Sequence, residues 1–600
     1  MRLRYRSVKR SPGSTLRRRV VVSSLLALLL AAGASFGPRW AERRIRARIE
    51  SEAARRGLRA EIRDVQVGLL PPLAVSGLRI EKPAEWSLAV ESARLTLRVW
   101  GRGLLGRSRL TLGRVSLVAG GMTLEATPTR WRIEGAPQGG LRARMEQPAA
   151  GGLVLTRRPA EGATEIDFVA SGLPAGQILT LRRRAPLLDA GLLSGTTRVR
   201  LATGSVHFEG DLHGQGVRLA SLSSFGPSDE GPAFGPPNVV GLRLSGAWNG
   251  PVSTLDLPTW QLATDGAVLS GSLRVEGVSV DPRMDLALEV ERVDFGRLLA
   301  SAGLDQPKAV TARAGGPPRD GDLGSASLKA RFSGRLADPA SFVVSQRLDF
   351  TPPRRPLPAI ERLRGDFTHE VTSSAGERKT ITVSADSPDF IALADVPPLF
   401  IRTLLLGEDS GFFGHSGIDL SELPAAILTN WARGGAPRGA STISQQLAKN
   451  LFLSHDKNVG RKLQELSLAL LLEAGLGKQR ILEIYVNVIE WGPGLYGLRP
   501  AGRRYFAREP RDLSPAQMAL LVSLVPGPVK YQRSLASGRP SAGFRPLVDG
   551  LLVKLRSVDL LTAEEYETAL ADELAVNTGP DVTTDGRNPD DTVPSDGPPS

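Results

Sequence analysis

One acidic, glycine-rich stretch decides how the second half of this chain is read: Glu408-Asp409-Ser410-Gly411-Phe412-Phe413-Gly414-His415-Ser416-Gly417. The apolar segment before it begins at Pro398, and proline is favoured in the first turn of a helix. Glu408 is therefore predicted at the point where a helix gives way to a turn, rather than on a solvated face. A carboxylate in such a place can act as a general base, and the alternative is a helix-end glutamate that meets only water.

A second block predicts a helix with one polar face, and it reads Gly439-Ala440-Ser441-Thr442-Ile443-Ser444-Gln445-Gln446-Leu447-Ala448-Lys449-Asn450. Ser441, Gln445 and Lys449 are spaced by four residues, which places them on one side of a helix. Ser441 or Thr442 can cap that helix, and the free amides of its first turn, with Lys449, would attract an anion. A capped amphipathic helix without a function has the same spacing, so that alternative stays open.

Two further helical blocks follow. In the first, Arg461 and Glu465 are one turn apart, with Lys462 beside them. A plain intrahelical ion pair there would stabilise the helix by only about 0.2–0.5 kcal/mol. The second block runs from Lys478 to Asn487 and places Glu483 and Asn487 on one face.

Taken in this order, the blocks closely resemble the peptidoglycan glycosyltransferases, over about residues 386–575. The resemblance implies a mainly α-helical, lysozyme-like domain in which Glu408 is the catalytic base and Glu465 a second carboxylate of the cleft. It implies structural roles for Glu483 and Asn487. It further implies a group of residues that bind the substrate and its pyrophosphate: Asp409, Phe412, His415, Ser441, Thr442, Gln445, Gln446, Lys449, Lys457, Arg461 and Lys462.

Two positions depart from the family pattern, and one apparent motif is rejected. Ala440 stands where a second glycine is usual, and Gln517 where glutamate is common. The stretch 454–457 fits the Ser-x-x-Lys pattern of penicillin-binding transpeptidases, but no Lys-Thr-Gly follows and the remaining chain is too short for such a domain. We therefore expect a monofunctional enzyme.

The resemblance implies that the chain polymerises lipid II into β-1,4-linked glycan strands with inversion, and releases undecaprenyl pyrophosphate. Lipid II, the growing strand, the membrane and other cell-wall synthesis proteins are the expected partners, and nucleic acid is not one. We expect no protein-bound metal and no obligatory cofactor, with a divalent cation such as Mg²⁺ as the alternative left open. Two other functions stay open: a lysozyme-like lytic enzyme, and a non-catalytic lipid-transport or scaffold protein of the envelope.

Charge and hydropathy at the start of the chain predict a membrane anchor. The net charge of the 600 residues is +14, and 1–19 hold eight basic residues and no acidic one. The uncharged run 20–37 is long enough to cross a bilayer, and the basic tail before it would stay in the cytoplasm. We expect a single-pass protein of the inner membrane with a periplasmic catalytic domain. The alternative is a signal peptide cleaved after Ala34.

The region 38–385 is predicted to be mostly antiparallel sheet after a helix over 41–57, since alternating runs such as 93–99 are separated by glycine and proline. Its opening, over 60–80, resembles AsmA-type envelope proteins, which hold long sheets near membranes and are linked to lipid handling; a β-rich spacer is the alternative. The Gly- and Pro-rich 314–324 is a linker candidate, and 576–600 is predicted to be a disordered tail. The predicted fold class is thus multidomain α+β.

The residue inventory excludes two kinds of site. The chain has no cysteine, so it has neither disulfides nor a catalytic thiol. Its five histidines show no ligand spacing, so a structural zinc is not expected.

Overall fold

The computed structural model describes residues 40–577, with gaps at 56, 68–72, 83–85, 97–107, 120–121, 127–128, 137–139, 147–151, 175–179, 182–184, 187, 220–232, 279, 302–322, 373–377, 422–423, 425–440 and 454–458. The predicted membrane span at 20–37 therefore lies outside the described residues, as does the predicted tail at 576–600 except for its first two residues, whose backbone amides donate to Gly538 O and Tyr505 O. Within the described part of the chain, no helix is both long enough and apolar enough to cross a membrane.

The first described element is a helix over 40–55, close to the predicted 41–57. One large antiparallel sheet follows, as the alternating pattern predicted, with α2 (Phe295–Ser301) after its eighteenth strand. Its first ten strands are β1 (Arg59–Val67), β2 (Leu73–Lys82), β3 (Trp86–Thr96), β4 (Ser108–Leu112), β5 (Val115–Ala119), β6 (Met122–Ala126), β7 (Thr129–Ala136), β8 (Gly140–Met145), β9 (Gly152–Ala160) and β10 (Ala163–Pro174). The other ten are β11 (Thr180–Leu181), β12 (Ala185–Pro186), β13 (Leu188–Ala202), β14 (Ser205–Leu219), β15 (Ala233–Asn249), β16 (Thr254–Thr264), β17 (Ala267–Glu276), β18 (Arg283–Asp294), β19 (Ser325–Arg335) and β20 (Asp338–Thr351).

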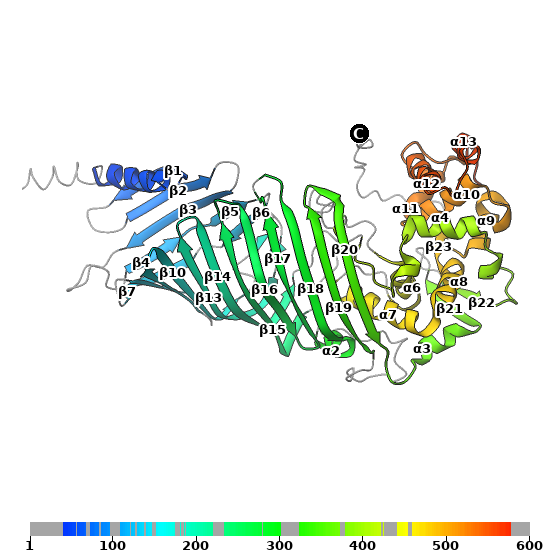
Figure 1. Ribbon diagram of the computed structural model, residues 1–600, viewed down its shortest axis with the longest axis horizontal. Coiled ribbons are helices and arrows are strands. Elements are labelled where there is room, and N and C mark those ends of the chain that lie inside the picture. Colours follow the sequence, from blue (N-terminus) through cyan, green and yellow to red (C-terminus); the bar gives the residue numbers. More distant parts are fainter. Residues whose placement is uncertain are drawn as a thin grey trace, which may run out of the picture.

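The sheet is a meander that branches once. Strand β3 pairs with β5 through its first half and with β4 through its second half. One branch continues through β6, β11 and β12, while the other continues through β7 to β10. From β10 the path goes to β13 and then through each following strand in turn to β20 (Figure 1). Each pairing of neighbouring strands is antiparallel, so short connections are enough to join them.

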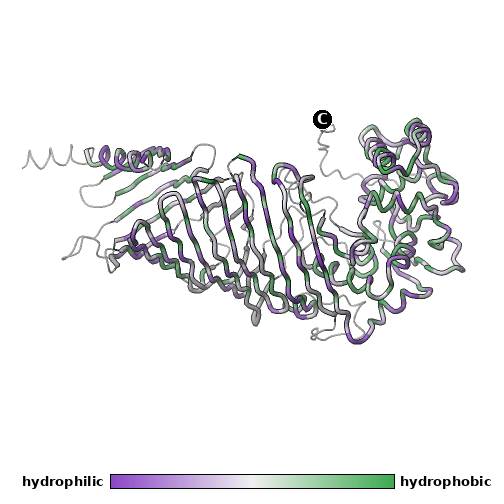
Figure 2. Tube along the Cα trace, in the orientation of Figure 1, coloured by the Kyte–Doolittle hydropathy of each residue, from purple (hydrophilic) through white to green (hydrophobic). Residues whose placement is uncertain are grey.

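The two faces of the sheet differ in chemistry. Arg198 of β13 is paired with Glu209 of β14, and the next pair along is Val199 with Phe208. Because successive side chains point to opposite faces, this alternation makes one face polar and the other apolar. The same alternation continues through β15 to β20, and Figure 2 shows it as a change of colour along each strand.

The helical part of the chain lies beside β20 at one end of the sheet (Figure 1). Its helices are α3 (Pro358–Glu361), α4 (Pro398–Glu408), α6 (Ile443–Phe452), α7 (Val459–Leu476), α8 (Lys478–Val488), α9 (Leu498–Phe506), α10 (Pro515–Leu524), α11 (Pro528–Gln532), α12 (Arg545–Ser557) and α13 (Ala563–Ala571). Its 3₁₀ turns are η4 (Arg362–Arg364), η5 (Leu393–Asp395), η6 (Phe412–Gly414), η7 (Pro510–Asp512) and η8 (Arg533–Leu535). Two small hairpins complete it: β21 (Phe367–Thr372) with β22 (Arg378–Val383), and β23 (Glu490–Gly492) with β24 (Leu495–Tyr496).

Two largely buried helices form the centre of this part. Seven of the ten residues of α10 are buried, as expected of a helix that is apolar on all sides. Helix α10 packs against α4 and α12. Helix α8 is also largely buried, and Tyr485 on it has no exposed surface. The ends of α4 and α6, which carry the first two sequence blocks, are therefore held on a rigid base.

The hydrophobic core extends past both predicted boundaries of the helical domain. Phe367 and Val383 belong to it, although they precede residue 386, and so do Leu299 of α2 and Ala326 of β19; Val576, which follows residue 575, also belongs to it. In addition, the side-chain amide of Gln346 on β20 donates to Ile418 O at 3.1 Å and accepts from Leu420 N at 3.0 Å. The last strand of the sheet is thus bonded to the loop that follows the acidic block.

Candidate active site

Glu408 is the last residue of α4, and its carboxylate is held by a chain of two hydrogen bonds. Gln446 Nε2 of α6 donates to Glu408 Oε2 at 2.8 Å, and Tyr485 OH of α8 donates to Gln446 Oε1 at 2.7 Å. Burial raises the pKa of Glu408, and the nearby Asp409 adds to this, while Gln446 and Lys449 oppose it. Burial also raises the pKa of Tyr485 well above 10, so its hydroxyl stays a neutral donor. The result is a fixed, partly desolvated carboxylate.

Asp409 holds the turn after Glu408 in place. Its Oδ1 faces His415 Nε2 at 2.9 Å, and its Oδ2 accepts from the backbone amide of Ile443, the first residue of α6, at 2.9 Å. The amide of Gly417 donates to His415 Nδ1 at 3.0 Å, so the ring proton is on Nε2 and points at Asp409. Asp409 thereby joins the acidic turn to the start of α6.

The start of α6 is capped as the sequence predicted. Thr442 is the N-cap, and its hydroxyl accepts from the amide of Gln445 at 3.2 Å. The same hydroxyl donates to Gly417 O at 2.7 Å, and Gln445 Nε2 also donates to that carbonyl, at 3.2 Å. Both side chains thus bind the acidic turn, and this contact with a distant loop could not be read from their helical spacing.

A basic cluster lies next to the start of α6. Lys462 Nζ of α7 donates to Ser441 Oγ at 2.8 Å and to Gln445 Oε1 at 2.7 Å, and it lies 3.2 Å from Glu465 Oε2. The other carboxylate oxygen of Glu465 lies 3.0 Å from Arg461 Nε. Burial lowers the pKa of Lys462, against the opposing effect of Glu465. Two cations share one buried carboxylate, so the three side chains keep a formal charge of +1 for a ligand.

Phe412, a predicted substrate contact, is completely buried. Lys478 Nζ lies 4.1 Å from the centre of its ring, a cation–π contact. Lys478 also donates to Glu473 Oε1 at 2.6 Å, and that oxygen accepts from Ser444 of α6 as well. These contacts indicate that Phe412 supports the acidic turn from the protein interior.

Sequence reasoning missed three residues that hold this arrangement: Tyr485, Glu473 and Lys478. In the sequence, Tyr485 and Lys478 stand out only as members of the helical block from Lys478 to Asn487, and Glu473 belongs to no motif. Each contacts a residue at least 29 positions away in the chain, and the spacing of residues along one helix cannot show such a contact.

The remaining predicted residues are placed as follows. Glu483 Oε1 accepts from Leu393 N, and Asn487 bonds both the amide and the carbonyl of Ile391, so both side chains hold the backbone of the segment that precedes α4. Lys449 contributes to the electrostatic field at Glu408. Ala440 and Lys457 lie outside the described residues. Gln517 forms a reciprocal capping box with Ser514 at the start of α10.

One group in the described part of the chain has the composition of a metal site. The ligand atoms of Asp409, His415 and Asp419 lie within 4.8 Å of one another. Both ring nitrogens of His415 are already in hydrogen bonds, and Asp419 Oδ1 accepts from Ser421 N at 2.8 Å. A cation would have to displace one of the contacts that shape the acidic turn, so these residues do not fit a metal ion. The cation alternative stays a prediction.

Comparison with known proteins identifies the helical part. The family described as Transglycosylase matches residues 377–542. The biosynthetic peptidoglycan transglycosylase of Methylobacillus flagellatus is 38% identical over 172 residues, which are 28% of this chain and 75% of that protein. The chain belongs to the biosynthetic peptidoglycan transglycosylase family.

Two other relatives match this chain over a smaller share of their own length. The biosynthetic peptidoglycan transglycosylases of Aromatoleum aromaticum and Nitrosomonas eutropha are 45% and 46% identical over 132 and 138 residues. The chain spans 57% of each of these two transglycosylases, and they cover 22% and 23% of this chain. The crystal structure of penicillin-binding protein 1A from Haemophilus influenzae matches at 18% identity, over 36% of this chain and 21% of that one, with a TM-score of 0.19, too low to show a shared overall fold.

Proposed function

We propose that this transglycosylase polymerises lipid II into glycan strands, in peptidoglycan biosynthesis. The observation that carries the proposal is the carboxylate of Glu408. It sits at the end of α4, partly desolvated, with one oxygen bound by Gln446. A base needs both a fixed position and a pKa moved toward the working pH, and Glu408 has both.

In the proposed reaction, Glu408 removes the proton from the 4-hydroxyl of the acceptor N-acetylglucosamine. That oxygen attacks C1 of the N-acetylmuramic acid at the end of the growing strand. The bond from C1 to the pyrophosphate oxygen breaks on the opposite side, which gives inversion and a β-1,4 link. The proton ends on Glu408, and the bonding electrons leave with undecaprenyl pyrophosphate.

The leaving pyrophosphate would be stabilised by the basic cluster. Arg461 and Lys462 share Glu465, which keeps both cations oriented while leaving a net positive charge. Ser441 and the start of α6 lie against Lys462. Charge-assisted donors that are fixed before the reaction stabilise a developing anion without reorganisation. Glu465 acts in this proposal by positioning the two cations.

We also propose that the protein works at the inner membrane, with the N-terminal segment as its anchor and the described residues in the periplasm. The basic run 1–19 before the apolar run 20–37 supports this orientation. Other cell-wall synthesis proteins are the expected partners there.

The test uses the full-length protein in detergent with labelled lipid II, beside Glu408→Gln and the control Glu567→Gln, an exposed position on α13. A ladder of lengthening glycan from the wild type and the control, absent from Glu408→Gln, is expected. Shortening of preformed strands would instead support the lytic function. Intact lipid II with folded wild type would support the scaffold function. The rate of lipid II polymerisation in EDTA, measured again after Mg²⁺ is added, tests whether the reaction needs a divalent cation.

A further inference from the structure

A large trough lies on the polar face of the sheet, away from Glu408. Its volume is about 1,700 Å³, and it extends from β8 to β20. It crosses eleven strands, in the order β8, β9, β10 and then β13 to β20. Neighbouring strands are about 4.8 Å apart, so the trough is roughly 48 Å long. This length suits an extended polymer rather than a small molecule.

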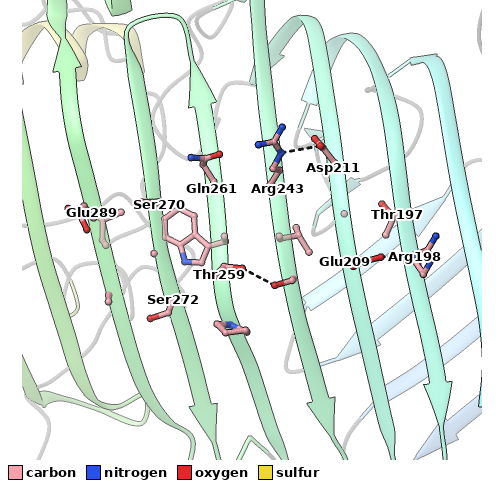
Figure 3. A pocket seen from close by; sticks show the side chains of 18 of the residues that line it. Thr197, Arg198, Glu209, Asp211, Arg243, Thr259, Gln261, Ser270, Ser272 and Glu289 are labelled. Carbon is pink, nitrogen blue, oxygen red and sulfur yellow. Dashed lines mark hydrogen bonds and ion pairs between the residues drawn. The ribbon is translucent and has the colours of Figure 1, made fainter.

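The middle of the trough has a floor of uncharged hydrogen-bonding groups. Ser245 of β15, Thr259 and Gln261 of β16, and Ser270 and Ser272 of β17 line it (Figure 3). The hydroxyls of Ser245 and Thr259 are 2.8 Å apart. Hydroxyl and amide groups can both donate and accept, which matches the hydroxyl and acetamido groups of a sugar chain.

Charged residues flank this floor on both sides, and many of them are paired. Toward β10, Arg198 bonds Asp167 and Glu209, and Arg243 bonds Asp211, the contact drawn in Figure 3. Toward β20, Lys329 lies 2.6 Å from Glu289. The lining holds seven basic and four acidic side chains, a formal excess of +3. An apolar ligand does not suit such a surface, and a weakly acidic one does.

The trough ends next to the catalytic part of the chain. Ser345 and Arg347 of β20 line its last section. Gln346 lies between them in the chain, so its side chain points to the opposite face of β20, where it binds Ile418 and Leu420, just after the acidic block. The last strand of the trough therefore lines the trough with one face and contacts a loop of the candidate active site with the other.

We propose that the trough binds a glycan strand that carries acidic peptide substituents, the product of the proposed reaction. The uncharged floor would bind the sugars, and the flanking excess of basic side chains would attract the carboxylates. The inference rests on the proposed function for the identity of the strand. Its consequence is that the sheet retains the product beside the enzyme and allows longer strands.

The test compares two matched double variants of the full-length protein. Ser270→Leu/Ser272→Leu removes two floor hydroxyls, whereas Ser327→Leu/Ser333→Leu makes the same change on the same face of β19, outside the lining. The probe is soluble, uncross-linked, fluorescently labelled peptidoglycan strands with intact peptides. Two lost hydrogen bonds should weaken binding about tenfold in the floor variant. The control should bind like the wild type, and both variants should keep the thermal midpoint of the wild type to within a few degrees.

A second readout is the length of the strands made from lipid II. The floor variant should consume lipid II at the wild-type initial rate but make shorter strands. Equal binding by all three proteins, or equal competition by dextran sulfate or by phospholipid vesicles, would overturn the proposal. If the floor variant binds strands more weakly but the wild type leaves lipid II intact, only the proposed activity is refuted. If lipid II is polymerised normally but the floor variant binds strands as well as the wild type does, only the proposal for the trough is refuted.

Discussion

The hydrogen-bond chain behind Glu408 makes a prediction that separates a catalytic role from a structural one. Tyr485→Phe removes a single oxygen atom that is fully buried and donates to Gln446 Oε1 at 2.7 Å. The amide of Gln446 would lose the contact that fixes its orientation. Leaving a buried acceptor unsatisfied costs about 1–3 kcal/mol, so the variant should be less stable by that amount.

The effect on Glu408 follows from the same contact. The hydrogen bond from Gln446 opposes the rise in the pKa of Glu408. If Gln446 turns away, the ionised carboxylate loses a hydrogen bond to a charged group, worth about 1.5–3 kcal/mol. One pKa unit corresponds to about 1.4 kcal/mol, so the pKa of Glu408 should rise by about one to two units. A base works in its ionised form, so the acid limb of the activity profile should move to higher pH by that amount.

The assay is the initial rate of lipid II polymerisation between pH 5 and pH 9, together with the free energy of unfolding in urea. Tyr505→Phe is a matched control, because Tyr505 is also buried and its hydroxyl also donates to a glutamine, Gln532 Oε1, at 2.7 Å. The control should lose stability but keep the wild-type pH profile. Equal pH profiles for both variants would refute the idea that Gln446 and Tyr485 set the ionisation of the base.

Three further predictions follow from the site. Glu408→Gln should lower polymerisation at least about a hundredfold, yet raise the thermal midpoint at neutral pH. Burial raises the pKa of Glu408, so the ionised group destabilises the fold as the pH rises through its folded-state pKa, and the gain should vanish below the ordinary value of 4.5 in a pH series of melting curves. Lys462→Met should raise KM for lipid II about tenfold, because Lys462 lies at the proposed pyrophosphate site. The control Lys554→Met, on the exposed face of α12, should keep the wild-type KM. An unchanged KM in Lys462→Met would show that Lys462 does not bind the pyrophosphate. Gln346→Leu should lower kcat severalfold by releasing the loop at Ile418 and Leu420, and a wild-type kcat would show that this contact is only a tether.

Local features of the fold were predictable from the sequence because their causes lie within a few residues. Pro398 begins α4, and Thr442 caps α6. The period-two alternation likewise predicted an antiparallel sheet, since it needs only the pleat of a strand. These predictions are confirmed.

Contacts between distant elements were not predictable. Tyr485 reaches Gln446 only because α8 packs beneath α6, and a buried tyrosine on an apolar helix looks like any other core residue. The branch of the sheet at β3 also has no local signal, because one strand is shared by two partners along its length. Phe412 was predicted to contact substrate because it lies within a catalytic block, and its burial depends on Lys478 and Glu473 from other elements.

The shared core explains why the sheet and the catalytic part have to be considered together. Helix α2, which follows a strand of the sheet, packs on α7, the helix that carries Arg461, Lys462 and Glu465. Leu299 of α2 has no exposed surface, so its burial depends on the helical part of the chain. A change in the sheet would therefore reach the basic cluster through packed side chains, and the acidic turn through Gln346. An enzyme that needs a fixed geometry around a leaving group gains rigidity from such a support.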